Sequence, residues 1–290
     1  MVIKIQKKGF TMFIRCWGAR GSIPVSGAHY LIYGGDTTCL EIRTRTDEIV
    51  LVDAGTGIRR LGNLLLAENR NRYTMIFTHS HWDHLMGFPF FRPLYQNGVE
   101  VYMRGCPAVH ETIRQIISRV MTSPNFPVNY DDLHAEITYN GTDDKTFTIG
   151  GMTVDTIPLS HPNGGSGYKF TEGGKTFVFL TDNELMYRHP GGLHYEDYVS
   201  FSADADLLIH DAEYTAEDYT TTRTWGHSVY TDVLRLAIEA GVAKLGLFHH
   251  NQDRTDDQIN EIVSSCRKII KNRTAAMDCF AVKQDMVLEL

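Results

Sequence analysis

A short segment of this 290-residue chain concentrates side chains that bind metal ions: His79, His81, Asp83 and His84 lie within six residues. Divalent ions such as Zn²⁺ accept both imidazole nitrogen and carboxylate oxygen. Two histidines separated by one residue can address one ion, and the following Asp-His pair can address a second. Such a pattern arises by chance in about two of a thousand chains of this length, so a metal site is favoured over a histidine-rich loop.

A site for two ions needs more donors than this segment supplies. His161, Asp182 and His249 each follow a strand-like run, as the cluster itself does. Ligands gather at the carboxyl ends of strands in open α/β proteins, because the loops there are held by a rigid sheet. These three residues are therefore the candidates that complete the site.

The elements that must position these residues are short strands and amphipathic helices. We expect one domain over residues 12–290, preceded by residues 1–11 as a short tail or an upstream start. Strands are expected at 13–17, 38–43, 49–52, 73–78, 99–103, 146–149, 153–158, 168–170, 176–180, 207–209 and 244–248, and helices at 58–67, 108–120 and 229–239.

Composition and charge narrow the function classes. The chain is 42% hydrophobic, enough for a sizeable core, and its net charge of −7 does not favour general attraction to nucleic acid or anionic membranes. Five scattered cysteines without CxxC pairing do not resemble a disulfide framework. With no export signal or membrane span in the sequence, we expect a cytoplasmic protein.

The order of the candidate ligands resembles that of the metallo-β-lactamase superfamily. The resemblance implies an α/β fold, a four-layer αββα sandwich of two mixed β-sheets flanked by helices. It also implies a dinuclear site at one edge of the sandwich, with Asp53 orienting a loop near it. In that family's pattern His79, His81 and His161 would bind one ion, Asp83, His84 and His249 the other, and Asp182 would bridge them.

The last third of the chain resembles the phosphodiesterase branch that contains ribonuclease Z. The similarity lies in "LLIHDAEY" (207–214) and in "GHSVYTDVLRLAIEAGVAKLGLFHH" (226–250). It implies that His227 is a proton donor held by Asp211, where that branch usually has a glutamate. A carboxylate can fix an imidazole tautomer and raise its basicity. The alternative for His227 is a residue beside a helix cap at Ser228.

Four further stretches, "WGARGSIP", "YGGDTTC", "DAGTGIRRLG" and "TDNE", resemble a bacterial subgroup of cyclic-nucleotide phosphodiesterase-like hydrolases. In this interpretation Gly34, Gly35, Gly164 and Gly165 let backbone N–H groups approach a phosphate. Glycine pairs are also common in plain turns, and the turn is the safer interpretation for each pair.

Together these features predict a phosphodiesterase that binds two divalent ions, with Zn²⁺ favoured and Mn²⁺ or Fe²⁺ as alternatives. A hydroxide bridging the ions would attack a small phosphodiester such as a cyclic nucleotide, with Asp83 as the orienting base. The ribonuclease Z branch commonly forms dimers, so the resemblance makes a homodimer an option. A segment at 187–198 is either an active-site lid or a surface loop.

Ribonuclease Z activity on tRNA is the first rival, because the catalytic elements are shared. That branch grips tRNA with a basic arm, whereas residues 121–160 carry one basic residue, Lys145, against six acidic ones. This charge has the wrong sign for gripping RNA. The six acidic residues of this segment are Asp131, Asp132, Glu136, Asp143, Asp144 and Asp155.

Thioester or lactam hydrolysis and non-catalytic nucleotide binding are the other rivals.

Overall fold

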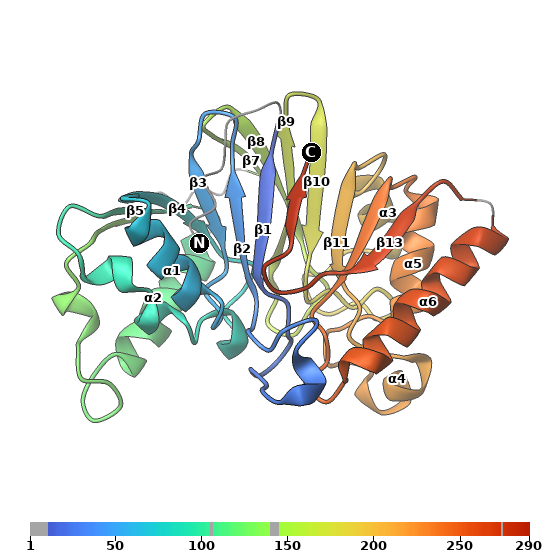
Figure 1. Ribbon diagram of the computed structural model, residues 1–290, viewed down its shortest axis with the longest axis horizontal. Helices are drawn as coiled ribbons and strands as arrows, with labels where there is room; N and C mark the ends of the chain where they lie inside the picture. Colours follow the sequence, from blue (N-terminus) through green and yellow to red (C-terminus); the bar gives the residue numbers. More distant parts are fainter. Residues whose placement is uncertain (1–10, 105–106, 140–144, 274) are drawn as a thin grey trace.

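Two seven-stranded β-sheets form the centre of the computed structural model, which describes residues 11–104, 107–139, 145–273 and 275–290 (Figure 1). The expected tail therefore lies outside the described residues except for Thr11. The first sheet has the strand order β14-β1-β2-β3-β4-β5-β6, and the second has the order β13-β12-β11-β10-β9-β8-β7.

The strands are short, and their bounds follow chain order. The first sheet contains β1 (Phe13–Gly18), β2 (Cys39–Arg43), β3 (Ile49–Val52), β4 (Arg72–Ile76), β5 (Glu100–Met103), β6 (Glu136–Tyr139) and β14 (Val287–Glu289). The second contains β7 (Thr146–Ile149), β8 (Met152–Pro158), β9 (Ser166–Glu172), β10 (Lys175–Leu180), β11 (Leu207–Asp211), β12 (Lys244–Phe248) and β13 (Asp278–Ala281).

Both sheets are mixed, and their parallel parts bring the carboxyl ends of several strands to one edge. In the first sheet β3, β4, β5 and β6 are parallel neighbours. In the second sheet β10, β11, β12 and β13 are parallel neighbours, and β8 runs in the same direction because it is antiparallel to β9, which is antiparallel to β10. Loops that follow these strands therefore meet at one edge of each sheet.

The sheets pack through alternate side chains. Val50 and Val52 of β3 lie in the core shared with Phe177 and Phe179 of β10, and all four are fully buried. Leu51, between the two valines, lies in a separate core on the other face of its sheet. Successive side chains on a strand point to opposite faces, so strands that are apolar throughout, such as Ile49–Val52, are covered on both sides.

Helices cover the outer faces. α1 (Ile58–Ala67) and α2 (Pro107–Val120) lie beside the first sheet, and α3 (Tyr195–Phe201), α5 (Tyr230–Glu239) and α6 (Asp256–Asn272) lie beside the second (Figure 1). α4 (Ala216–Thr222) lies below α6 in this view. The expected four-layer arrangement, two mixed sheets between helices, is confirmed. Single 3₁₀ turns, η1 to η5, occupy Ala28–Tyr30, Trp82–His84, Phe88–Phe90, Arg92–Tyr95 and Tyr130–Asp132.

The predicted elements are present with small shifts at their ends. The hairpin expected around residues 172–174 joins β9 to β10, and Gly173 and Gly174 adopt φ of 54° and 77°, which glycine tolerates without strain. The sequence reading missed six elements: β6, β13, β14, α3, α4 and α6. The largest, α6, begins with a capping box in which Thr255 and Gln258 exchange hydrogen bonds.

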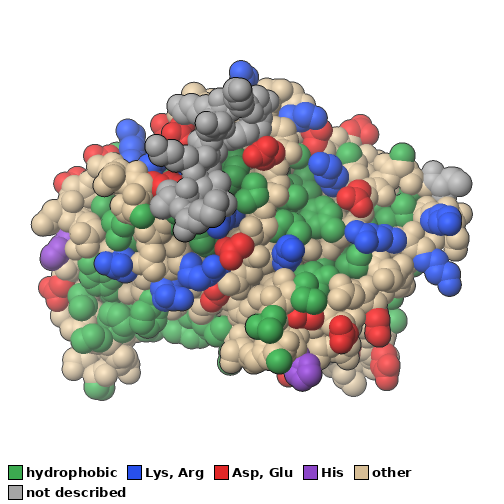
Figure 2. Space-filling view, in the orientation of Figure 1, with side chains coloured by type: hydrophobic (Ala, Val, Ile, Leu, Met, Phe, Trp, Pro, Cys, Tyr) green, Lys and Arg blue, Asp and Glu red, His purple; other side chains and the backbone are tan. Residues whose placement is uncertain are grey.

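Charges of both signs are interspersed over the face of the molecule seen in Figure 2, without a continuous basic surface. Within the described part of the chain, no helix is long and apolar enough to cross a membrane. Cys16, Cys39, Cys266 and Cys279 are buried free thiols. Two of the acidic residues counted above, Asp143 and Asp144, lie outside the described residues.

Removing an aromatic ring from the layer between the sheets should destabilise the protein strongly. We expect Phe179→Ala to lower the free energy of unfolding by about 3–5 kcal/mol, because the two packed sheets cannot move together far enough to fill the space that the ring leaves. Phe90, which is 54% exposed, is the matched control, and Phe90→Ala should change stability by about 0.5 kcal/mol or less. Urea denaturation measures both, and equal losses would contradict this account of the core.

Candidate metal centre

The seven predicted ligands meet at the edge where the parallel strands end. They come from four segments that are distant in sequence: His79, His81, Asp83 and His84 after β4, His161 after β8, Asp182 after β10, and His249 after β12. Their donor atoms form two groups within 4.8 Å of one another: His79, His81, His161 and Asp182; and Asp83, His84 and His249. A third group joins Asp182 and His249 to His227, which is not one of the seven predicted ligands. Both sheets therefore contribute donors to one compact cluster.

Asp53, at the end of β3, holds the segment that carries the local histidine cluster. Its carboxylate accepts hydrogen bonds from the backbone N–H and the hydroxyl of Thr78, both at 2.8 Å. The same carboxylate lies 2.8 Å from Nδ1 of His84. Asp53 thus fixes the loop and one imidazole, in agreement with the orienting role expected from the sequence.

Asp182 lies between the two groups of donors. Its Oδ2 atom is 3.5 Å from Nε2 of His79 and 3.4 Å from Nε2 of His249. Its Oδ1 atom is 3.3 Å from Nε2 of His84. One carboxylate therefore faces imidazoles of both groups, which is the arrangement that a bridging ligand requires.

Asp83 serves the second group only. Its Oδ2 atom lies 3.2 Å from Nε2 of His249 and 3.4 Å from Nε2 of His84. The same oxygen accepts a hydrogen bond from the backbone N–H of Ser22 at 2.9 Å. In the first group, Nε2 of His161 lies 2.9 Å from Nδ1 of His81, so these two imidazoles also converge on one point.

The positions of the imidazole nitrogens fit a metal site better than a buried cluster of histidines held by hydrogen bonds. Nδ1 of His161 lies 2.9 Å from the carbonyl oxygen of Gly226, and Nδ1 of His249 lies 2.9 Å from Glu213. Such partners fix the tautomer and leave Nε2 to face an ion. Among the described residues, Nε2 of His79 and Nε2 of His84 are buried without a hydrogen-bond partner. Unpaired buried polar atoms are costly, and a metal ion would satisfy both.

The charges of the site also favour bound cations. Burial opposes ionisation of Asp182, but the imidazoles of His249 and His84 outweigh burial and hold the pKa of this carboxyl well below its usual range. Burial and the neighbouring imidazole of His84 lower the pKa of His79 well below its usual value. Ionised carboxylates and neutral imidazoles are the forms that bind metal ions. Burial opposes protonation of His84 and His249, but the neighbouring carboxylates outweigh burial and raise the pKa of both rings well above the usual value. These two imidazoles would therefore release a proton when an ion takes its place.

Three residues of the site adopt a backbone conformation that is uncommon outside glycine. Asp53, Asp182 and His249 have φ of 61°, 54° and 55°, in the left-handed region. Asp53 and His249 directly follow a strand, and Asp182 lies two residues after one. The chain therefore turns sharply at each of these residues. Such strain costs about 1–3 kcal/mol per residue and persists where the surrounding structure enforces it.

His227 lies beside the ligands, as predicted, and three carboxylates face it, with Asp182 at 4.0 Å from Nδ1. Its Nδ1 atom is 3.8 Å from Asp211 and 3.6 Å from Glu213. Burial opposes protonation of His227, but Glu213 and Asp211 outweigh burial and raise its pKa to about 9. The ring stacks on His249 with a centroid separation of 4.7 Å.

Asp211 also binds the backbone of two loops, a role that the sequence does not predict. Its oxygens accept hydrogen bonds from the backbone N–H groups of Asn183 at 2.6 Å and Ser228 at 2.8 Å. Asp211 therefore ties the segment after Asp182 to the segment that carries His227.

Glu213 is the functional residue that the sequence reading missed. It is buried, it lies closer to His227 than Asp211 does, and it also contacts His249. A signal was present in "HDAEY", because residues two apart on an extended chain point to the same side. Asp211 and Glu213 were therefore placed to face the same neighbour.

The two glycine pairs differ in their surroundings. A side chain at Gly35 would collide with the carbonyl oxygen of Val25, and Gly34 adopts φ of 84°, so packing and turn geometry explain this pair. Gly164 closes a turn with the carbonyl oxygen of His161, and Gly165 lies against His79. The turn interpretation thus has support at both pairs, and contact with a phosphate stays a prediction.

The loop before His227 is held by a buried carboxylate. Glu184 accepts hydrogen bonds from the backbone N–H groups of Thr224 at 2.8 Å and Gly226 at 2.9 Å. It also lies 2.7 Å from Nε2 of His189. Glu184 is 1% exposed and lies beneath the loop.

The 187–198 segment is anchored at both ends. Ser160 donates its hydroxyl to the carbonyl oxygen of Tyr187 at 2.6 Å, and Tyr198 donates to Pro158 at 2.9 Å. These contacts favour a packed surface loop among the two alternatives. His250 lies 2.7 Å from the carbonyl oxygen of Val282, on the side away from the ligands.

Comparison with known proteins gives matches over most of the chain. The family described as "Beta-lactamase superfamily domain" matches residues 48–250. Ribonuclease Z from Oceanobacillus iheyensis is 23% identical over 287 residues, covering 82% of this chain and 90% of that protein.

Solved structures show the same fold. The metallo-beta-lactamase fold protein YhfI from Bacillus subtilis superposes with a TM-score of 0.71 at 21% identity, covering 97% of this chain and 100% of that one. A diphosphatase from the PhnP family superposes with a TM-score of 0.67 at 15% identity, covering 96% and 98% of the respective chains. At these identities the likeness establishes the architecture only.

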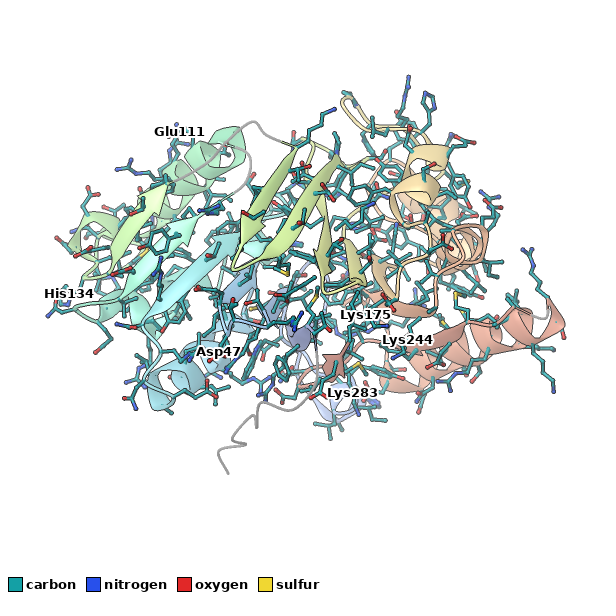
Figure 3. The ribbon with its side chains drawn as sticks, turned by 90° about the horizontal axis from the view of Figure 1, so that it is seen from above. Asp47, Glu111, His134, Lys175, Lys244 and Lys283 are labelled. Carbon is teal, nitrogen blue, oxygen red and sulfur yellow. The ribbon has the colours of Figure 1, made fainter. Side chains whose placement is uncertain are left out.

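Metal content of variants should reflect the position of Asp182 between the groups. We expect Asp182→Ala to lose both ions, and His81→Ala, which affects the first group, to lose one. The control is His134→Ala, since His134 is exposed and lies just before β6, the edge strand of the first sheet (Figure 3). Elemental analysis after dialysis gives ions per chain. Loss of only one ion in Asp182→Ala would contradict a bridging position.

Proposed function

The chain belongs to the beta-lactamase superfamily, and on this premise we propose that it is a two-metal phosphodiesterase acting on a small phosphodiester, with cyclic nucleotides as first candidates. The coarser prediction, a metal-dependent hydrolase, is confirmed by the family match and the ribonuclease Z relative. The observation that carries the proposal is the position of Asp182 between two groups of histidines, with His227 beside it.

The proposed ligand sets follow the two groups. His79, His81 and His161 would hold one ion, Asp83, His84 and His249 the other, and Asp182 both. Bound divalent ions lower the pKa of water toward neutrality and stabilise charge on the attacking and leaving oxygens of a phosphodiester. Mixed nitrogen and oxygen donors suit Zn²⁺ and also Mn²⁺ or Fe²⁺, and we place Zn²⁺ first.

Asp83 is suited to orient the attacking water. Its Oδ2 atom faces the second group of donors, and the backbone N–H of Ser22 holds the carboxylate in place at 2.9 Å. A carboxylate fixed in this way can accept a hydrogen bond from water and aim its lone pair at phosphorus. Because the donor is backbone, the orientation does not depend on a mobile side chain.

His227 is suited to protonate the departing alkoxide. Nδ1 faces Glu213 and Asp211, which favour the protonated ring, and the stacking on His249 fixes the ring plane. Nε2 is then the nitrogen that can give its proton to the leaving oxygen. A poor leaving group such as a sugar hydroxyl needs this proton, which supports phosphodiester over lactam or thioester chemistry.

Ribonuclease Z activity is the second candidate, because curated relatives with that name match most of the chain. Charge weighs against it. Asp131, Asp132 and Glu136 are exposed on the segment between α2 and β6 and at the start of β6. Phosphate contacts by lysine and arginine dominate the affinity of proteins for RNA, and this region offers the opposite sign.

Replacing the proton donor should separate turnover from metal binding. We expect His227→Ala to lower kcat on a cyclic nucleotide, whose sugar hydroxyl is a poor leaving group, by about 10²–10⁴-fold, while the metal content stays that of the unchanged protein. Hydrolysis of bis(p-nitrophenyl) phosphate, whose leaving group needs no proton, should be affected much less. The His134→Ala variant controls for loss of an exposed imidazole. If His227→Ala loses metal in proportion to activity, His227 is a ligand or a structural residue instead.

Substrate class is tested by assaying cyclic nucleotides and precursor tRNA side by side with Zn²⁺ or Mn²⁺. We expect the cyclic nucleotide to be hydrolysed with the larger kcat/KM and with little dependence on salt, because a single phosphate contact releases few counterions. Faster cleavage of tRNA that declines steeply with salt would favour ribonuclease Z activity. Nucleotide binding without turnover in metal-loaded protein would establish the non-catalytic alternative.

A further inference from the structure

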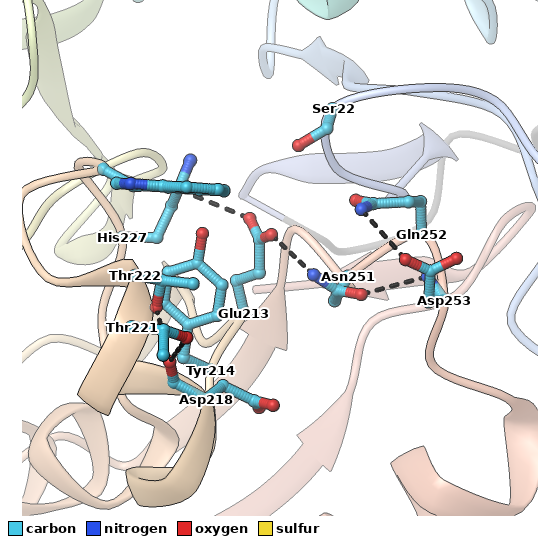
Figure 4. Close-up of a pocket in the computed structure, with 11 residues that line it drawn as sticks. Ser22, Glu213, Tyr214, Asp218, Thr221, Thr222, His227, Asn251, Gln252 and Asp253 are labelled. Atoms are coloured by element: carbon cyan, nitrogen blue, oxygen red, sulfur yellow. Dashed lines mark hydrogen bonds and ion pairs between the residues drawn. The ribbon is translucent and has the colours of Figure 1, made fainter.

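A cavity of about 560 Å³ opens beside His227, between α4 and the loop at residues 251–253 (Figure 4). Its size lies within the range of small-molecule sites, about 300–1,000 Å³. His227 and Glu213 form its inner wall, and Asp253 lies at the far side. The cavity therefore leads outward from the place where the leaving group would depart.

The outer wall carries an unsatisfied group. Within the described part of the chain, Oε1 of Gln252 is buried without a hydrogen-bond partner. Because buried polar atoms are normally paired, this oxygen indicates a cavity shaped for a ligand that donates hydrogen bonds. On the inner wall, Nδ1 of His227 faces the carboxylates of Glu213 and Asp211, so Nε2 is the nitrogen left for a ligand.

The outer wall is rich in hydrogen-bond acceptors and contains acidic but no basic residues among the described lining. Asp253 is exposed, and its carboxylate is free of ion pairs in the described structure. Asp218 is paired with Arg254 at 2.6 Å, which offsets part of its charge. Hydroxyl groups of a ligand can donate to these acceptors, whereas a phosphate, which is anionic and has only acceptors, is repelled.

An aromatic side chain completes the wall. Trp225 is 62% exposed, and it belongs to the loop that Glu184 holds through Thr224 and Gly226. A side chain at Gly226 would collide with the ring of His161, so the loop lies directly against the donor cluster. An exposed indole on an anchored loop offers a flat surface on which a nucleobase can stack.

We propose that this cavity binds the uncharged, hydroxyl-bearing nucleoside of the substrate and discriminates against a second phosphate. The inference rests on the proposed function, because it assigns the cavity to the alcohol part of a phosphodiester hydrolysed at the donor cluster. Trp225 stacks on the base, and Gln252 and Asp253 accept hydrogen bonds from hydroxyl or amino groups. Asp253 supplies the charge that disfavours polyanionic substrates.

The test compares a nucleoside 2′,3′-cyclic phosphate with the same compound carrying an additional 5′-phosphate, in metal-loaded full-length protein. We expect the second phosphate to lower kcat/KM by about tenfold or more, since like charges brought together across a binding site are strongly unfavourable. Asp253→Asn should reduce this ratio severalfold. Glu111 is an exposed acidic residue on α2 (Figure 3), which contributes no residue to the lining of the cavity. Glu111→Gln should therefore leave the ratio unchanged.

Trp225→Ala tests the stacking wall independently. We expect it to raise KM for the nucleoside cyclic phosphate by about tenfold, with kcat and metal content less affected, because base stacking contributes mainly to binding. Unchanged KM would overturn the assignment of Trp225.

The outcomes separate this inference from the function on which it rests. If the protein hydrolyses bis(p-nitrophenyl) phosphate but accepts the 5′-phosphorylated compound equally well, or if Asp253→Asn leaves the ratio unchanged, the inference about the cavity fails and the phosphodiesterase proposal stands. If metal-loaded protein hydrolyses none of these phosphodiesters, both fail.

Discussion

The structure depends on one constraint: ionisable groups buried at the edge between two sheets must be neutralised there. Asp83 and Asp182 are almost completely withdrawn from water, as are His79, His84, His161 and His249. Burying charge without a partner is very costly, and imidazole nitrogens that point at one another cannot all donate and accept. Divalent cations resolve both difficulties, since they neutralise the carboxylates and accept the nitrogen lone pairs.

The surroundings of the donors can be understood from the same constraint. Asp53, Asp211 and Glu184 each use a buried carboxylate to hold backbone N–H groups of a loop at the site. The strained backbone at Asp182 and His249 is retained because these anchors and the adjoining strands leave no alternative. The rigidity of the sheets is thereby extended into the loops, so that the donors remain close together.

Much of the candidate metal centre can be predicted from the sequence, because local signals are strong where chemical side chains are concentrated. The spacing in residues 79–84 and the placement of His161, Asp182 and His249 after strands predict the candidate donors. Apolar runs such as Ile49–Val52 gave most strands. The pairing order of the strands depends on contacts between residues far apart in sequence, which no local pattern contains.

The elements and residues that were not predicted from the sequence have physical explanations. The end of the chain carries no chemical signal comparable to the histidines, so α6 and β13 were not predicted. For α6 a signal was present, because this helix has a capping box and regular apolar spacing. The sequence alone does not separate Glu213 from Asp211 as the partner of His227, because only the fold reveals that Asp211 is engaged with backbone N–H groups. The choice between two neighbouring carboxylates required coordinates.

The division of donors between the two sheets makes the site a property of the whole fold. The first sheet contributes His79, His81, Asp83 and His84, and the second contributes His161, Asp182 and His249. Strand β14, from the end of the chain, belongs to the first sheet beside β1, so even that sheet is complete only when the whole chain has been placed. The donor cluster and the finished architecture therefore come into existence together.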